Sequence, residues 1–191
     1  MDKFKNFFDL AAHKKEGEDY SIATREVRGS NVVIVAPHGG MERRTAEMAE
    51  AIAGNDHSLY VFKTLGQKGA FREMHVTSTH FDEPRCLDLV AKTDVTLTIH
   101  GCRFEEPVVC LSGLDKKLQS KLADAFNAAG VKALTSGHPY QSGKLPENIC
   151  NRNRQKQGVQ LEFSFGIRDN PALMDKCVRI VRDSLKNPAM K

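Results

Sequence analysis

The chain has 191 residues, 40% of them hydrophobic and 27% charged, and its formal net charge is +4. This composition is typical of one globular domain with a buried core, and the scattered basic residues exclude a concentrated basic arm. No apolar stretch is long enough to cross a bilayer, and the first residues lack the core of a secretory signal. We therefore expect a single domain over 1–191 that is cytoplasmic when made and has no membrane partner. Five widely spaced cysteines without a Cys-x-x-Cys pair indicate reduced thiols rather than a disulfide framework.

The predicted elements alternate between strands and helices along the chain. Residues 1–29 are expected to form an amino-terminal helix and connector, and the core covers about 30–191. The expected strands are 31–36, 58–62, 74–78, 94–99, 107–111, 131–134 and 158–164, and the expected helices are 45–53, 82–92, 114–129 and 170–185. Residues 135–157 form a long polar loop, a type of segment that is usually functional. Some connections are too short for a crossover helix, so we predict a three-layer α/β/α fold with a mixed parallel and antiparallel sheet.

Three of the predicted strands end in a residue that can bind a metal or move a proton. The run Val32 to Ala36 leads into Pro37-His38-Gly39-Gly40, the strand 94–99 leads into His100-Gly101, and the run 158–161 leads into Glu162. The carboxyl ends of parallel strands lie at one edge of a sheet, so these residues can converge there. Two imidazoles and a carboxylate are typical ligands of zinc, and a further carboxylate makes such a site catalytic.

The carboxylate ligand has two candidates. The glycines after His38 let the chain turn, so that Glu42 can point back at the imidazole. Glu47, on the following helix, is the competitor, and spacing alone does not separate the two. His80 is a substitute for one of the two histidine ligands, because the segment 75–84 is rich in groups that bind or position ligands.

Glu162 follows an apolar strand, where burial of a carboxylate without a partner is costly. This position favours a role as the general base that takes a proton from water. The nearby residues Arg152, Arg154 and Arg168 are candidate anion clamps, since guanidinium holds a carboxylate in a two-pronged geometry. Ser78, in the ligand-rich segment, is a further candidate for substrate binding.

Seven ordered stretches between about residue 16 and Arg168 share the residue types of a known family. They are Glu16-Gly17-Glu18-Asp19-Tyr20-Ser21-Ile22, Ala36-Pro37-His38-Gly39-Gly40, Ser58-Leu59-Tyr60-Val61-Phe62, His75-Val76-Thr77-Ser78-Thr79-His80-Phe81-Asp82-Glu83-Pro84, Ile99-His100-Gly101-Cys102, Asn148-Ile149-Cys150-Asn151-Arg152 and Gly158-Val159-Gln160-Leu161-Glu162. On these stretches the chain resembles the poly-gamma-glutamate hydrolase family of bacteriophages and bacilli, also labelled phage-related replication protein.

The resemblance implies a single catalytic domain with a core similar to that of zinc carboxypeptidases. In that picture one Zn²⁺ per chain is held by His38, a glutamate shortly after it and His100, while Glu162 promotes the water and arginines bind the anionic polymer. The family has one more residue and a Pro-Gly pair at the turn where this chain has Met41-Glu42-Arg43-Arg44-Thr45. We prefer Glu42 over Glu47 as the ligand.

The expected reaction is cleavage of the gamma-linked amide bonds of poly-gamma-glutamate by a monomer with no nucleic-acid partner. Action outside the cell after lysis, where a phage clears a host capsule, fits the family. One alternative is a zinc amidase that acts on a small N-acyl amino acid. An alternative of another class is a phage DNA-associated replication module without catalysis, which predicts a contiguous basic face and salt-sensitive DNA binding.

Overall fold

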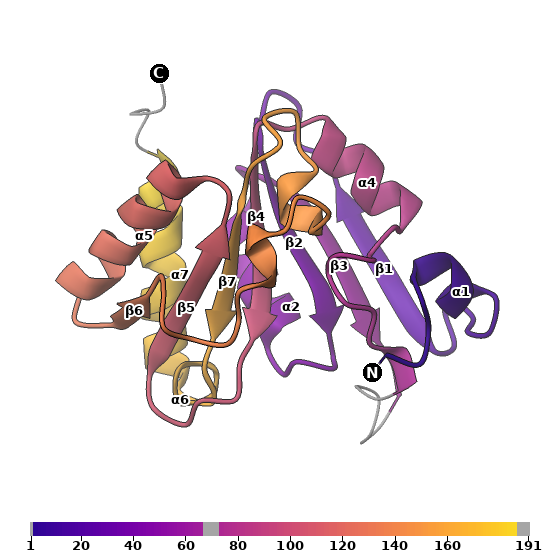
Figure 1. Ribbon diagram of the computed structural model, residues 1–191, viewed down its shortest axis with the longest axis horizontal. Coiled ribbons are helices and arrows are strands. Elements are labelled where there is room, and N and C mark those ends of the chain that lie inside the picture. The colour runs from indigo at the N-terminus through magenta and orange to yellow at the C-terminus, as the bar shows by residue number, and fades with distance from the viewer. Residues whose placement is uncertain (1, 67–72, 187–191) are drawn as a thin grey trace.

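The computed structural model describes residues 2–66 and 73–186, and its central feature is one mixed β-sheet (Figure 1). Within these residues the strand order is β1-β3-β2-β4-β7-β5-β6. The strands are β1 (Tyr20–Arg25), β2 (Val32–Gly39), β3 (Ser58–Thr64), β4 (Val95–Gly101), β5 (Val108–Gly113), β6 (Lys132–Leu134) and β7 (Val159–Phe163).

The strand directions put the ends of the central strands at the same edge. Strands β3, β2, β4 and β7 are parallel to one another, whereas β1 runs antiparallel to β3 and β5 runs antiparallel to β7. The outermost strand β6 is parallel to β5. The mixed parallel and antiparallel sheet is therefore confirmed, and the carboxyl ends of β2, β4 and β7 meet at one edge.

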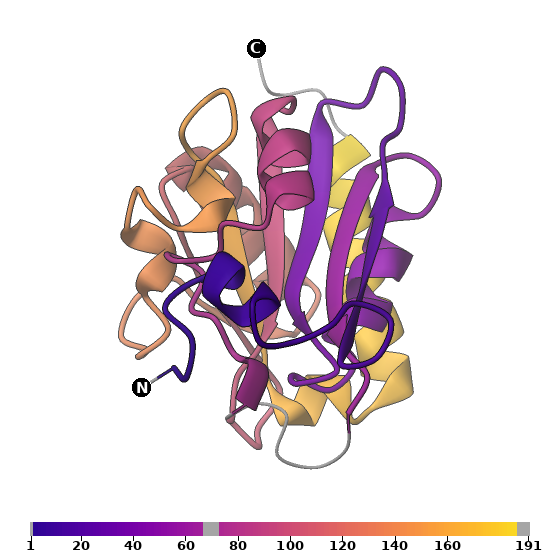
Figure 2. The same ribbon diagram turned by 90° about the vertical axis from the view of Figure 1, so that its right-hand side faces the viewer.

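Helices cover both faces of the sheet, which confirms the three-layer α/β/α fold (Figure 2). One face carries α2 (Thr45–Ala53), α5 (Lys116–Ala128) and α7 (Pro171–Lys186), and α6 (Phe165–Arg168) leads into α7. The other face carries α1 (Phe7–Ala11), α4 (Pro84–Ala91) and the 3₁₀ helices η1 (Ser142–Lys144) and η2 (Ile149–Asn151). No helix of the described residues is long and apolar enough to span a membrane.

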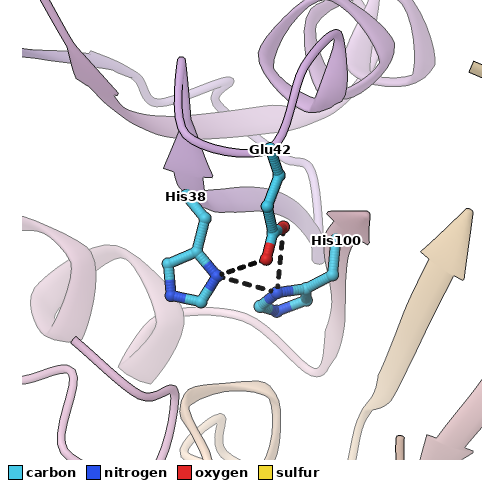
Figure 3. Close-up of side chains that lie close together, drawn as sticks. All are labelled: His38, Glu42 and His100. Carbon is cyan, nitrogen blue, oxygen red and sulfur yellow. Dashed lines mark hydrogen bonds and ion pairs between the residues drawn. The ribbon is translucent and has the colours of Figure 1, made fainter. Parts of the chain in front are cut away.

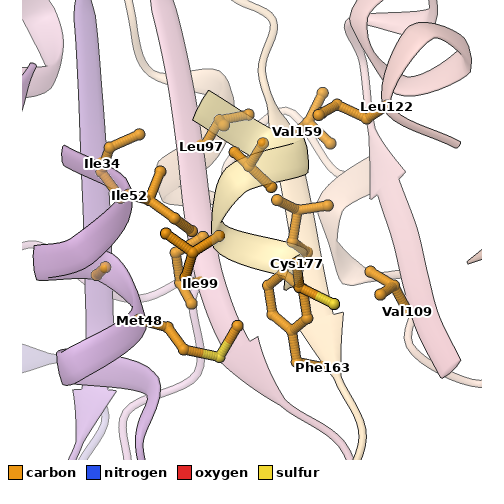
Figure 4. Packing of buried hydrophobic residues seen from close by; sticks show 14 of the residues in the cluster. Ile34, Met48, Ile52, Leu97, Ile99, Val109, Leu122, Val159, Phe163 and Cys177 are labelled. Atoms are coloured by element: carbon orange, nitrogen blue, oxygen red, sulfur yellow. The ribbon is translucent and has the colours of Figure 1, made fainter. Parts of the chain in front are cut away.

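Alternate side chains of β2 and β3 pack into two separate hydrophobic cores, one on each face of the sheet, as the period of a strand requires. Ile34, Leu97 and Val159 pack with Ile52 and Cys177 beneath α2 and α7 (Figure 4). The aromatic rings of Phe7, Tyr20, Phe62 and Phe81 lie in the second core, together with Val33 and Val35 of β2. All five cysteines are buried and unpaired, in agreement with reduced thiols.

Two expectations about the elements were wrong. Residues 75–77 have no regular structure, so the strand expected at 74–78 does not form. The polar main-chain groups of this segment bond to side chains instead of a neighbouring strand: Val76 O contacts His38 Nε2, and Thr77 N donates to Asp2. The region 1–29, expected as a helix and connector, also contains β1, an edge strand whose outward side chains are largely polar.

Candidate metal centre

Three side chains from two neighbouring strands meet at the carboxyl edge of the sheet (Figure 3). His38 lies near the end of β2, Glu42 lies in the turn that follows, and His100 lies near the end of β4. The His38 Nδ1 atom is 3.1 Å from Glu42 Oε1 and 3.1 Å from His100 Nδ1, and His100 Nδ1 is 3.6 Å from Glu42 Oε2. The three ligand atoms all lie within 4.8 Å of one another.

The Gly39-Gly40 pair makes the turn that returns Glu42 to the histidines. Gly39 passes so close to β3 that a Cβ atom there would lie 2.7 Å from Phe62 O. Gly40 has a φ of +77°, and its Cβ atom would lie 2.6 Å from Thr64 Oγ1. The turn then closes through a hydrogen bond of 2.9 Å from Glu42 N to His38 O. Only glycine combines this positive φ with this close approach at low cost.

Hydrogen bonds on the far side of each ligand fix its orientation. The Nε2 atom of His38 is 2.9 Å from Val76 O, and because a carbonyl can only accept, Nε2 carries the hydrogen. The Nδ1 lone pair of His38 therefore faces Glu42 and His100. The other carboxylate oxygen, Glu42 Oε2, accepts a hydrogen bond of 2.8 Å from Gly101 N. Outer hydrogen bonds of this kind are typical of metal ligands in proteins.

The donor set fits a zinc ion. Burial by itself would raise the pKa of Glu42, but the adjacent imidazoles of His38 and His100 hold it well below the usual range, so the carboxylate is charged. The Glu42 carboxylate and one nitrogen atom of each imidazole converge on a common centre, an arrangement that a cation stabilises. Nitrogen and oxygen ligands in this number are those of catalytic zinc sites with an open position.

Glu162 lies beside the centre, on β7, where it is the register partner of His100. Burial, together with the negative charge of Glu42, raises the pKa of Glu162 to about 8. The Gln160 side-chain amide donates a hydrogen bond of 2.8 Å to Glu162 Oε1. Asn148 Nδ2 in turn donates to Gln160 Oε1 at 2.9 Å, which fixes the direction in which this amide points.

A cavity of about 210 Å³ lies at this centre. Its lining comprises the three candidate ligands, Glu162 and Gln160, together with His75, Ser78, Arg103 and Tyr140. Sequence reasoning gave no role to Arg103, Tyr140 or Gln160. Two of them had a usable signal. Arg103 lies two residues after Gly101, in the loop at the end of a strand, and Gln160 lies on the same strand face as Glu162. Tyr140 comes from the long polar loop, and its hydroxyl accepts a hydrogen bond of 3.2 Å from Arg103 N.

The two substitute ligands lie outside the cluster. Glu47 is exposed on α2, where its carboxylate is 3.4 Å from Lys63 Nζ. His80 is exposed as well, and within the described residues the group that could hold a metal ion consists of His38, Glu42 and His100. The shortened turn after Gly40 therefore still delivers its glutamate to the histidines.

The arginines predicted as anion clamps are occupied by protein groups. Arg168 is buried behind Gly101 and donates to three main-chain oxygens, Phe163 O at 2.8 Å, Arg43 O at 2.6 Å and Cys102 O at 3.0 Å. Arg152 donates to Glu147 O. Neither lines the cavity, whereas Ser78 does, with its Oγ atom 3.4 Å from His100 Nε2.

Arg154 lies at the opposite edge of the sheet. Its guanidinium contacts Asp94 and Asn31, which precede β4 and β2. It lines a larger cavity of about 450 Å³ there, far from the histidines. Within the part of the chain that the structure describes, the group of side chains that could hold a metal ion lines the smaller cavity and not this one.

Comparison with known proteins gives consistent matches over nearly the whole chain. The profile of the poly-gamma-glutamate hydrolase family matches residues 4–185. The SPbeta prophage-derived UPF0714 protein YoqZ of Bacillus subtilis (strain 168) is 38% identical over 168 residues. The match covers 85% of this chain but 59% of that relative, so the chain spans about three fifths of the relative's length.

Two solved structures share the fold closely. A bacteriophage poly-gamma-glutamate hydrolase superimposes with a TM-score of 0.89 at 26% identity, over 97% of both chains. A zinc-free form of YNDL superimposes with a TM-score of 0.89 at 29% identity, over the full length of both. The likeness to zinc carboxypeptidases stays a prediction. The family profile and these two structures agree with the motifs read along the sequence, and the chain belongs to the poly-gamma-glutamate hydrolase family.

Proposed function

We propose that this chain hydrolyses the gamma-glutamyl amide bonds of poly-gamma-glutamate, with one zinc ion held by His38, Glu42 and His100. The observation that carries the proposal is the convergence of these three ligand atoms within 4.8 Å, beside a second, buried carboxylate, that of Glu162. Family membership supports the substrate, and the zinc-free designation of the YNDL structure supports the metal for that relative. A zinc ion held there would polarise the scissile carbonyl and lower the pKa of a water molecule.

The residues of the chain divide the remaining work. Glu162 takes the proton from the attacking water and delivers it to the leaving amine, a role that its raised pKa favours. Gln160 holds the Glu162 carboxylate through a hydrogen bond of 2.8 Å. The hydrogen bond from His38 Nε2 to Val76 O keeps the Nδ1 lone pair directed at the metal.

Arg103 is the residue that we assign to the substrate carboxylates, with Ser78 beside it. Among the described arginines, Arg103 lines the cavity, and no ion pair with a described residue engages its guanidinium. Its main chain is fixed by the hydrogen bond from Arg103 N to Tyr140 OH, so the side chain extends from a fixed point. Guanidinium suits this task because its paired donors match both oxygens of a carboxylate. Arg152, Arg154 and Arg168 lie outside the lining of this cavity, and each of them donates hydrogen bonds to protein groups.

The test combines metal analysis with polymer cleavage. Zinc is quantified in the purified chain by elemental analysis, and the size of poly-gamma-glutamate is followed with and without a chelator. We expect one zinc per chain and chelator-sensitive shortening of the polymer. His100→Ala should lose both zinc and activity, whereas Glu162→Gln should keep zinc and lose about 10²- to 10⁴-fold in kcat, the usual contribution of a general base.

Other results would favour the other functions. Zinc without polymer cleavage, but with hydrolysis of small N-acyl amino acids, would indicate the amidase. Salt-sensitive DNA binding that survives His100→Ala would indicate the replication module. A chain without zinc would contradict the proposed site. The monomeric state, and action on a host capsule after release by lysis, belong to the same proposal, and light scattering of the purified protein checks the first.

A further inference from the structure

The histidines of the metal centre share one outer support, the loop 75–78. The Nε2 atom of His38 donates to Val76 O at 2.9 Å, and the Nε2 atom of His100 lies 3.4 Å from Ser78 Oγ. Both contacts are on the side of the ring away from the metal-facing Nδ1 atoms. One loop of four residues therefore bears on the orientation of both imidazoles, although they come from different strands.

This loop is not held by a strand ladder, because residues 75–77 have no regular structure. On one side, Ile149 N donates to Ser78 O at 2.9 Å. On the other side the support comes from the start of the chain. The two carboxylate oxygens of Asp2 divide between two points of the loop: Oδ1 is 2.7 Å from His75 Nδ1, and Oδ2 accepts a hydrogen bond of 2.7 Å from Thr77 N.

Neighbouring contacts fasten the same amino-terminal segment independently of Asp2. Lys3 pairs with Glu73, and Phe7 N donates to Asp82 Oδ1 at 2.7 Å. The Asp2 side chain is 25% exposed and the His75 side chain is 16% exposed, so their contact is mostly shielded from water. Shielded hydrogen bonds to a carboxylate restrict motion more than exposed ion pairs do.

We propose that Asp2 is a positioning residue for the metal centre, which sets the orientation of His38 and His100 through the loop 75–78. The inference rests on the proposed zinc site. The path from Asp2 to the two histidines is short. The Asp2 carboxylate holds the His75 ring and Thr77 N. Val76, between these two residues, contacts His38, and Ser78, directly after Thr77, contacts His100. The His75 ring also lies against the His38 ring, with centroids 4.3 Å apart.

The experiment measures zinc binding in the full chain, with Asp2→Asn and Asp2→Ala as variants. Zinc affinity is obtained by competition with a chromogenic chelator, and the zinc release rate from the same assay in excess chelator. We expect Asp2→Ala to bind zinc about 10- to 100-fold more weakly, as loss of an outer-sphere partner typically does. Asp2→Asn should lie in between, because its amide oxygen still accepts one of the two hydrogen bonds.

Cobalt substitution gives a readout that a purely structural role would not change. The visible absorption of Co²⁺ bound to the variants should shift or weaken, since it reports the ligand geometry. The matched control is Asp82→Ala, which removes the hydrogen bond from Phe7 N at the same amino-terminal segment without touching the loop 75–78. It should lower thermal stability while zinc affinity and the Co²⁺ spectrum stay as in the parent chain.

The outcomes separate this inference from the proposed function. Asp2 variants that bind zinc as tightly as the parent, with the same release rate and Co²⁺ spectrum, overturn the positioning role alone. A parent chain that binds zinc but leaves poly-gamma-glutamate intact overturns the substrate assignment, and the role of Asp2 is still decided by the zinc data. A parent chain without zinc overturns both. An equal loss of zinc affinity in Asp82→Ala would also contradict a role specific to Asp2.

Discussion

Replacement of Arg168 by methionine tests whether this arginine supports the fold or binds substrate. The guanidinium is 2% exposed and donates to the main-chain oxygens of Phe163, Arg43 and Cys102. Phe163 O also accepts a hydrogen bond of 3.0 Å from Cys102 N, so it keeps a partner in the variant. Among the described residues, the oxygens of Arg43 and Cys102 have no second main-chain donor.

The magnitude follows from these two oxygens. A buried acceptor left without a donor costs about 1–3 kcal/mol. The Cys102 oxygen lies in a buried contact and the Arg43 oxygen in a part-buried one, so the two together cost about 2–5 kcal/mol. Methionine fills a similar volume and removes the cost of burying a charge, which offsets part of the loss. We expect Arg168→Met to lower the free energy of unfolding by about 2–4 kcal/mol.

The assay is urea unfolding followed by circular dichroism, carried out in chelator so that metal binding does not contribute. Arg154→Met is the matched control, because Arg154 forms an exposed ion pair with Asp94, a type of contact worth about 0–1 kcal/mol. If Arg168→Met unfolds within 1 kcal/mol of the parent chain while its KM for the polymer rises strongly, the structural role is refuted and substrate binding by Arg168 is restored.

Three further predictions concern the site. In the metal-free protein the pKa of Glu162 is raised to about 8, so the folded chain binds more protons than the unfolded chain above the usual carboxyl pKa. Chemical unfolding should show stability that falls as pH rises towards 8, and Glu162→Gln should abolish this slope. Gly40 has a φ of +77° and lies against Thr64, so Gly40→Ala should lower the free energy of unfolding by about 2–4 kcal/mol and weaken zinc binding. Chemical unfolding and chelator competition measure the two effects, and a variant with unchanged stability and zinc affinity would contradict the role of this turn. Zinc at 100 times its Kd should add about 2.7 kcal/mol to the stability of the parent chain but not of His100→Ala, measured by thermal unfolding.

The local residue patterns of the sequence predicted much of the fold and the convergence of the candidate ligands His38, Glu42 and His100. Strong apolar runs mark β2, β4 and β7, and each ends at or near a site residue, His38, His100 or Glu162. Since parallel strands carry their carboxyl ends to the same edge, their convergence is a consequence of the alternation of strands and helices. The glycines after His38 similarly predict the turn, because few other residues tolerate a positive φ.

Contacts between segments that are distant in the sequence could not be predicted from local residue patterns. The segment 74–78 has the β-branched residues of a strand, yet its main-chain groups bond to Asp2 and His38, more than 35 positions away in each case. Edge strand β1 has exposed polar residues and becomes a strand because β3 offers it hydrogen bonds.

The choice among chemically equivalent residues also depended on the tertiary structure. Glu42 and Glu47 are equally suitable carboxylates in the sequence, but the closed turn directs Glu42 at the histidines, whereas α2 turns Glu47 towards Lys63. The arginines differ in the same way. Arg168 donates to main-chain oxygens and Arg154 lies at the opposite edge of the sheet, whereas Arg103 lines the cavity. The sequence determined which strands end in candidate ligands, because that depends on local patterning. Only the packing of distant segments decided which nearby charges face the site, because hydrogen bonds and burial are properties of the folded chain.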